Sequence, residues 1–334
     1  MGRLRTIGIL GAAAVLLFPC IAVHGSEKRD VETREIRLRA PPGGRIAVPK
    51  YEYGLLVFWH LGEPGMPHFT VLDPFSERTV AQITAEAPEA RETYPMAFAV
   101  FPDRRRFVVS AATLNYSGKR SLWLLFYGAD GKLTHHQRIT PFHPSLLAVA
   151  EDGTVWGAGC NERTVDEWNS AEPVLYQWSE DGRLLKRLLA QRDFLARRRD
   201  YPAGGRGVGI TVRELGMSAL AVSRDRVVLF DTGSGVLAEI STSGGVLGMY
   251  TPPRRHLPDG KPTSSRGLAV TGDGEIYAAF DRICRFNRAS RAWEPVEDPP
   301  ALAGMGVIFG SSDAGILRSG ESGDRFHFRL VTMK

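Results

Sequence analysis

The sequence predicts an all-β protein, a six-bladed β-propeller with four antiparallel strands in each blade. Three observations support this: a repeated phrase that runs from an apolar strand into a tight turn, a recurring strand-turn-strand pattern, and unpaired strands at both ends of the chain. The phrase occurs four times, at 99–103, 148–153, 221–226 and 269–274. A further apolar run follows each copy, which makes the unit a β-hairpin, and a spacing of roughly 40 to 50 residues is typical of propeller blades.

The second half of each unit is also a strand, a polar turn and another strand. Apolar residues alternate at 124–127 and 175–178, and weaker copies lie at 69–72, 237–240 and 283–286. Alternation with period two, bounded by Asp, Asn, Gly and Pro, indicates strands joined by turns. Each unit therefore supplies four strands, as one propeller blade does.

Five units have the complete strand order, and their first strands are predicted to start near Ile46, Met96, Leu146, Ser218 and Gly267. The last unit has only three strands, at 304–310, 316–318 and 326–332, while residues 35–39 form an isolated strand at the other end. Pairing that strand with the last three completes a sixth blade and removes the exposed edge of an open array. We expect one propeller domain over residues 26–334.

Four Asp-Gly dipeptides follow the repeat, at Asp130-Gly131, Asp152-Gly153, Asp181-Gly182 and Asp273-Gly274. Acidic repeats are sometimes calcium ligands, but these dipeptides lack the multi-carboxylate spacing of an EF-hand loop. Each falls between two predicted strands, where Asp-Gly supplies the positive backbone angles of a tight hairpin turn. We interpret them as turns.

Residues 1–25 are predicted to be a secretory signal peptide. Arg3 and Arg5 precede an apolar stretch at 7–18 that is too short to span a bilayer, and small residues place the cleavage site near Gly25. Cys20 follows Phe18-Pro19, which fits a lipidation signal poorly. We expect a secreted or periplasmic protein without a membrane span after the leader.

Composition excludes some classes of partner. The 334 residues carry 42 Lys and Arg against 37 Asp and Glu, a formal charge of +5 with both signs interspersed, which is not the pattern of a nucleic-acid-binding protein. After leader removal only Cys160 and Cys284 remain, with no metal-binding spacing. We expect two half-buried thiols on strands; whether they form a disulfide depends on the distance between their Cβ atoms, which stays open.

The segment Arg226-Val227-Val228-Leu229-Phe230-Asp231-Thr232-Gly233 resembles the repeats of NHL-type and related six-bladed propellers, the gluconolactonase-like or TolB-like group. Arg226 stands where that group prefers glycine. The resemblance covers most of the mature chain as repeat rhythm, and it implies the propeller fold. It implies little about activity, because that architecture hosts lactonases, lyases, sensors and interaction scaffolds.

Loop lengths indicate where a ligand binds. In a propeller the connections from second to third strands and between blades share one face, and here they include the long loops at 60–67, 85–94, 113–120, 157–173, 190–215 and 251–266. Long loops on a rigid scaffold are where binding function concentrates. We therefore expect a protein, small molecule or carbohydrate to bind this face of a monomer. The candidate ligand-binding residues are Asn161, Asp166, Glu167, Trp168, Asn169, Arg206, Arg213, Arg254, His256 and Arg266.

The sequence contains no G-x-S-x-G or H-E-x-x-H motif, so no catalytic residue is assigned and the leading expectation is binding without chemistry or cofactor. One alternative is a metal-dependent lactone or ester hydrolase, in which carboxylates and amides at the channel mouth hold a divalent cation that activates water. Its candidate ligands are Glu63, Asn115, Asn161, Asp166 and Asp231. A structural or surface-assembly subunit is the third possibility.

Overall fold

The computed structural model describes residues 31–38, 45–46, 49–61, 66–161, 171–195, 219–231, 235–253, 267–297, 307–312, 315–319 and 326–333. The leader and its cleavage site at Gly25 lie outside these ranges. In the described part of the chain, no helix is long and apolar enough to cross a membrane.

Almost all of the described chain forms antiparallel β-sheet. Four sheets have four strands each, in chain order: β7 (Glu92–Val100), β8 (Phe107–Leu114), β9 (Arg120–Tyr127) and β10 (Leu133–Arg138); β11 (Phe142–Val149), β12 (Val155–Asn161), β13 (Pro173–Trp178) and β14 (Leu184–Ala190); β15 (Ala219–Ser223), β16 (Arg226–Asp231), β17 (Val236–Ser241) and β18 (Val246–Tyr250); and β19 (Leu268–Val270), β20 (Ile276–Ala279), β21 (Ile283–Asn287) and β22 (Ala292–Pro295). A short helix, α1 (Gln191–Leu195), follows β14.

The fifth sheet has nine strands and contains both ends of the described chain. One half consists of β3 (Lys50–Glu52), β4 (Leu55–Leu61), β5 (Phe69–Asp73) and β6 (Arg78–Ile83), with β2 (Arg45–Ile46) beside β4; the other half consists of β23 (Val307–Ser312), β24 (Gly315–Ser319), β25 (Phe326–Met333) and β1 (Val31–Leu38). The predicted pairing of the N-terminal strand with the last unit is confirmed, because β1 is antiparallel to β25 over its whole length. The two halves meet where β23 and β3 pair in parallel.

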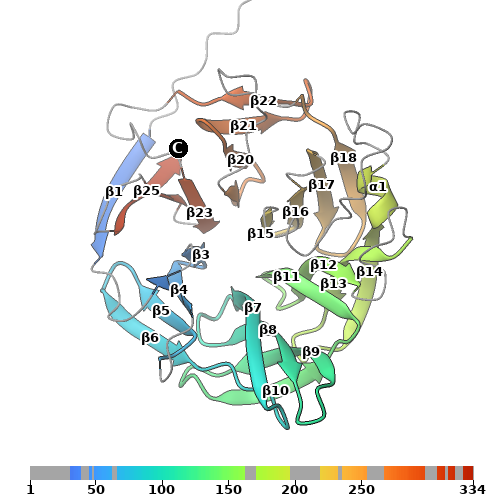
Figure 1. The fold of residues 1–334 in the computed structure, drawn as a ribbon. Helices are drawn as coiled ribbons and strands as arrows, with labels where there is room; N and C mark the ends of the chain where they lie inside the picture. Colours follow the sequence, from blue (N-terminus) through green and yellow to red (C-terminus); the bar gives the residue numbers. More distant parts are fainter. Residues whose placement is uncertain are drawn as a thin grey trace, which may run out of the picture.

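The sheets are arranged around a ring, with the first strand of each group nearest the centre (Figure 1). These six inner strands are β3, β7, β11, β15, β19 and β23. From β7 to β23 each inner strand contacts the next one, and β23 pairs with β3. Hydrogen bonds from Lys50 and to Glu52 connect β3 with β7. The inner strands therefore contact one another all the way round.

Apolar residues fill the junctions between neighbouring groups of strands. Among the described residues, the buried side chains form six clusters, one at each junction. Residues that alternate along a strand point to opposite faces of its sheet. Accordingly, on β12 Trp156 and Ala158 pack toward the β15–β18 sheet, whereas Val155 packs toward the β7–β10 sheet. The alternation in the sequence thus builds a two-sided core in each sheet.

The four Asp-Gly turns are confirmed. Gly131, Gly153, Gly182 and Gly274 have φ between +73° and +84°, and each donates its N–H to the carbonyl three residues earlier. Gly131 also lies against the preceding sheet, since a Cβ there would come within 2.2 Å of the Gln82 carbonyl oxygen. This turn is therefore a point of close contact between neighbouring sheets as well as a reversal of the chain.

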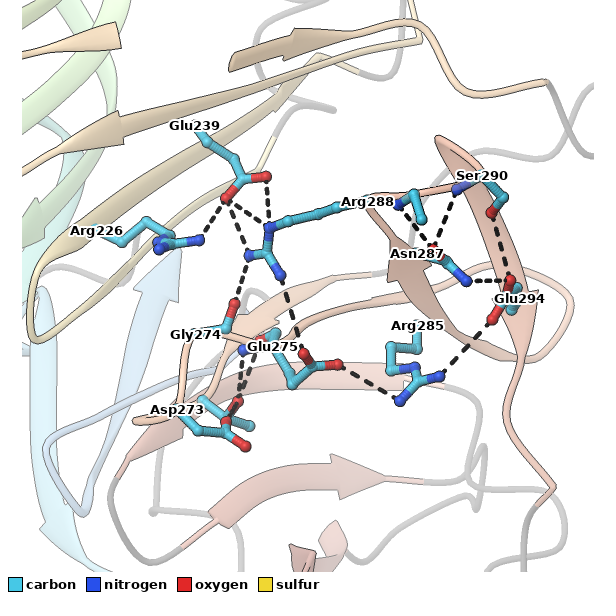
Figure 2. Close-up of polar contacts among 12 residues, drawn as sticks. Arg226, Glu239, Asp273, Gly274, Glu275, Arg285, Asn287, Arg288, Ser290 and Glu294 are labelled. Carbon is cyan, nitrogen blue, oxygen red and sulfur yellow. Dashed lines mark hydrogen bonds and ion pairs between the residues drawn. The ribbon is translucent and has the colours of Figure 1, made fainter. Parts of the chain in front are cut away.

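A buried carboxylate connects the β15–β18 sheet to the β19–β22 sheet. Glu239 on β17 is 1% exposed and accepts hydrogen bonds from Arg226 on β16 and from Arg288, which follows β21 (Figure 2). Arg288 also donates to the Gly274 carbonyl and lies 3.9 Å from Glu275. Hydrogen bonds to Glu239 raise the pKa of Arg288 above its ordinary value, although burial acts in the opposite direction. The contact therefore joins two neighbouring sheets through a buried carboxyl group and the guanidinium of Arg288.

Two sequence predictions need correction. The first unit begins at β3 rather than near Ile46, because Pro49, which has no N–H to donate to a ladder, precedes the inner strand. Ile46 lies in β2 and pairs with His60 at the far end of β4. Cys160 and Cys284 are fully rather than half buried, and they form no disulfide, since they lie in separate clusters on β12 and β21.

Candidate functional site

A cavity of about 1090 Å³ lies along the axis of the ring. Its walls come from β3, β11, β15, β19 and β23, and it extends to the turns that join first to second strands, with Arg104, Glu151, Arg224 and Gly272 at that end. We call this end of the ring the turn end and the opposite end the loop end. The lining combines aliphatic residues such as Leu146, Leu268 and Ile308 with charged, hydroxyl-bearing and aromatic side chains. This axial cavity is the candidate site.

Side chains of β3 close the side of the axial cavity next to β7. Lys50 Nζ donates to the carbonyls of Phe98 on β7, at 2.9 Å, and Leu147 on β11, and it lies 2.7 Å from Glu52 Oε1. Glu52 Oε2 accepts the N–H of Val100 at 2.9 Å. Some main-chain groups at the inner edges of β7 and β11 are thereby bonded to side chains rather than to another strand.

Two hydroxyl groups have the same role elsewhere on the ring. Tyr53 donates to the Val149 carbonyl of β11 at 2.6 Å. Ser311 of β23 donates to the Val270 carbonyl of β19 at 2.7 Å and accepts the Val270 N–H at 3.2 Å. Both the main-chain N–H and the C=O group of Val270 are therefore bonded.

Strand β15 differs from these neighbours. It is an edge strand of its sheet, and in the part of the chain that the structure describes no side chain bonds to the main chain of residues 219–223. The Ser223 hydroxyl, which is buried at the turn end of β15, also has no hydrogen-bond partner there. Since buried polar groups are nearly always bonded, this wall offers free donors and acceptors to a ligand.

The charged side chains at the turn end are paired. Arg104 lies 3.3 Å from Asp73, and Arg224 lies 3.8 Å from Glu151. These pairs are at least one-quarter exposed, so solvent screens them and each contributes little stability. Deeper in the wall, burial raises the pKa of Tyr51 above its ordinary value, and its hydroxyl lies 3.1 Å from Ser312 Oγ. The phenol is therefore neutral at neutral pH.

The loop-end residues predicted to bind a ligand are only partly described. Asn161 is at the end of β12, 9% exposed, and its side-chain amide donates to Glu172 at 3.1 Å. The other predicted residues lie outside the described ranges: Asp166, Glu167, Trp168, Asn169, Arg206, Arg213, Arg254, His256 and Arg266. Their role at the loop end stays a prediction.

The alternative metal ligands fall into two groups. Glu63 and Asp166 lie outside the described residues, whereas Asn115, Asn161 and Asp231 each lie at or just after the end of a second strand. Asn115 Oδ1 accepts the N–H groups of Ser117 and Lys119. This oxygen therefore stabilises the connection between β8 and β9, which spans only residues 115–119. Among the described residues, no three His, Cys, Asp or Glu side chains are grouped closely enough to hold a metal ion.

The polar side chains of β3 do not follow from the strand pattern of the sequence. A first strand near Ile46 gives Lys50, Glu52 and Tyr53 no role. A signal was present, because four of the other five inner strands read Phe-Ala-Val or Leu-Ala-Val, whereas this one reads Lys-Tyr-Glu-Tyr. Charged residues in place of small apolar ones on an inner strand indicate contacts across the ring axis.

His143 on β11 makes stability depend on pH. It is 5% exposed; burial, with the positive charge of Arg120, lowers the pKa of His143 to about 4, against an ordinary value of 6.5. Between pH 6.5 and 4 the unfolded chain binds a proton at this residue that the folded chain does not, so the free energy of unfolding decreases as the pH falls through this range. His143→Phe should make the decrease shallower in urea titrations at pH 7, 6, 5 and 4.5. An unchanged pH profile in this variant would contradict the assignment to His143.

Comparisons with known proteins show similarity at the level of structure. No family model and no curated protein matches the chain. A candidate exported protein from Bacteroides fragilis is 10% identical, with a TM-score of 0.51 over 91% of this chain and 95% of its own. A member of the DUF4221 family from Bacteroides vulgatus is 12% identical, with a TM-score of 0.49 over 92% of this chain and 99% of its own. At 10% identity, the similarity to the Bacteroides fragilis protein extends to the fold alone.

Proposed function

We propose that the chain is a six-bladed β-propeller, secreted or periplasmic, that binds a ligand in the axial cavity and catalyses no reaction. The continuous contacts of the inner strands and the pairing of β1 with β25 support a closed ring of six blades. The fold shared with a candidate exported protein supports export, and the leader predicted at residues 1–25 agrees with it.

The axial cavity is the observation that carries the binding role. Ligand pockets in proteins are commonly 300 to 1,000 Å³, mostly apolar, with a few placed polar groups. The cavity reaches this size, and its lining combines aliphatic residues with the free polar edge of β15.

The polar side chains of the β3 segment already have partners within the protein, which favours binding over catalysis. Lys50, Glu52 and Tyr53 direct their functional atoms at main-chain groups or at one another. A general base or nucleophile needs its reactive atom directed at a substrate. The metal-dependent hydrolase, the structural subunit and a partner at the loop end stay predictions.

A tryptophan at Gly272 should obstruct the turn end of the cavity. Gly272 has the same place in its turn as Glu151 in the turn between β11 and β12, and both turns close with the same hydrogen bond, so the backbone accepts a side chain there. In a thermal-shift screen of amides, carboxylates and sugars, compounds that raise the melting temperature of the natural protein should bind Gly272→Trp at least tenfold more weakly.

The matched control is Ala129→Trp. Ala129 is at the equivalent position of the Asp-Gly turn between β9 and β10, is exposed, and does not line the cavity. It should leave both the melting temperature and the binding unchanged. Compounds that bind Gly272→Trp as well as they bind the natural protein would place the site elsewhere, and a screen without any binding compound would overturn the proposed function.

A further inference from the structure

We propose that the ligand of the axial cavity is an extended peptide segment that adds as a strand to the inner edge of β15. This rests on the proposed function and specifies its ligand class. Side chains of β3 and β23 bond to part of the inner edges of β7, β11 and β19, as described above. Along β15 the described residues leave both the N–H and the C=O groups of the inner edge for a ligand.

The register of the β15–β16 hairpin identifies these groups. Ser223 pairs with Arg226 across a two-residue turn, and the two residues that flank such a turn exchange both of their hydrogen bonds. Hydrogen-bonded and non-hydrogen-bonded pairs alternate along an antiparallel ladder. Ala219, Ala221 and Ser223 therefore bond to β16, whereas Leu220 and Val222 direct their N–H and C=O groups away from β16, toward the cavity.

The arrangement of these groups matches a peptide main chain. Leu220 and Val222 are two residues apart, about 7 Å along the strand, and each offers one donor and one acceptor. This is the pattern by which a strand edge pairs with an added strand. A sugar or a small anion would satisfy only part of it.

Size and lining agree with such a ligand. A five-residue strand is about 17 Å long, which accommodates a segment of four or five residues. Side chains alternate along an added strand; the walls on β11, β19 and β23 offer Leu146, Leu268, Val270 and Ile308, and β3 opposite offers Lys50 and Glu52. Small or apolar side chains fit this lining, whereas the specificity for an extended conformation comes from the main chain.

The test uses blocked pentapeptides, acetylated and amidated, of the pattern Xaa-Val-Ser-Val-Xaa, added as a pool to the full-length protein. Amide hydrogen exchange is measured at residue resolution by NMR. Exchange at Leu220 and Val222 should slow at least tenfold, whereas Ala221, which already donates to β16, should change little. The same pool with N-methylated valines should give no protection, because it lacks the N–H groups that pair.

A pair of variants tests the same edge from the protein side. Val222→Pro removes an N–H that faces the cavity but no bond to β16, and it should weaken peptide binding at least fivefold. Val222→Ala shortens the same side chain but keeps the N–H, so it should weaken peptide binding less than Val222→Pro does. If Val222→Pro does not fold, the N-methylated pool tests the same hydrogen bonds on the natural protein.

The outcomes separate this inference from the proposed function. Peptides that protect other amides, or that bind equally well when N-methylated, would overturn strand addition. The proposed function, ligand binding in the axial cavity, would stand. The same holds if only non-peptide compounds bind in a manner sensitive to Gly272→Trp. If neither peptides nor other compounds bind, both proposals are overturned.

Discussion

Gly310→Ala is expected to lower the free energy of unfolding by about 4 kcal/mol, because it adds a side chain where β23 and β3 meet. Gly310 has φ +135°, a conformation that side chains strongly disfavour, and a Cβ there would come within 2.1 Å of the Tyr51 carbonyl oxygen. Gly310 and Tyr51 are partners in the parallel pairing that joins the first and last groups of strands. Relief of the clash therefore requires this junction to separate.

Urea unfolding followed by tryptophan fluorescence measures this effect, and Gly118→Ala is the control. Gly118 also has a positive φ, +76°, but no atom lies within 4 Å of the added Cβ. It should cost only the backbone strain, about 1 to 2 kcal/mol. If the two variants lose equal stability, the contact between Gly310 and Tyr51 is not the cause.

Glu239→Ala is expected to cost about 3 kcal/mol, because it leaves two arginines without their shared carboxylate. Removal of one partner of a buried ion pair typically costs 3 to 5 kcal/mol. The side chains of Arg226 and Arg288 are 23% and 33% exposed, so water partly compensates them and the loss falls at the lower end. The measurement is the midpoint and slope of urea unfolding.

Glu180→Ala provides the comparison for Glu239→Ala. Glu180 also pairs with an arginine of a neighbouring sheet, Arg106 at 2.9 Å, but the two side chains are 59% and 46% exposed. An exposed pair of this kind contributes about 1 kcal/mol or less. Equal losses in the two variants would show that burial of Glu239 does not determine its contribution.

Much of the strand order could be predicted from the sequence, for a physical reason. Each inner strand must present apolar side chains to two neighbouring sheets and then reverse direction, so alternation followed by a tight turn recurs along the chain. The pairing of residues near Ile36 with the last strands could be predicted by counting, since three strands cannot complete a four-stranded unit.

The axial cavity could not be predicted in the same way. Its free edge on β15 has two causes: the pairing register with β16, and the lack of a hydrogen bond from side chains of the other described inner strands. Neither cause produces a recognisable pattern in residues 219–223. The sequence likewise gives no sign that Glu239 is buried. A glutamate on a strand is usually solvated, and here Arg226 together with Arg288 of the next sheet makes it a structural contact.

The pairing of β1 with β25 also sets an order of events. These strands are the first and last of the described chain, so their pairing cannot form until synthesis has reached Met333. Ile36 on β1 therefore has no partner strand until the residues of β25 have been made. We expect the strand pair that completes the nine-stranded sheet to form later than the hairpins of the sheets between its two ends.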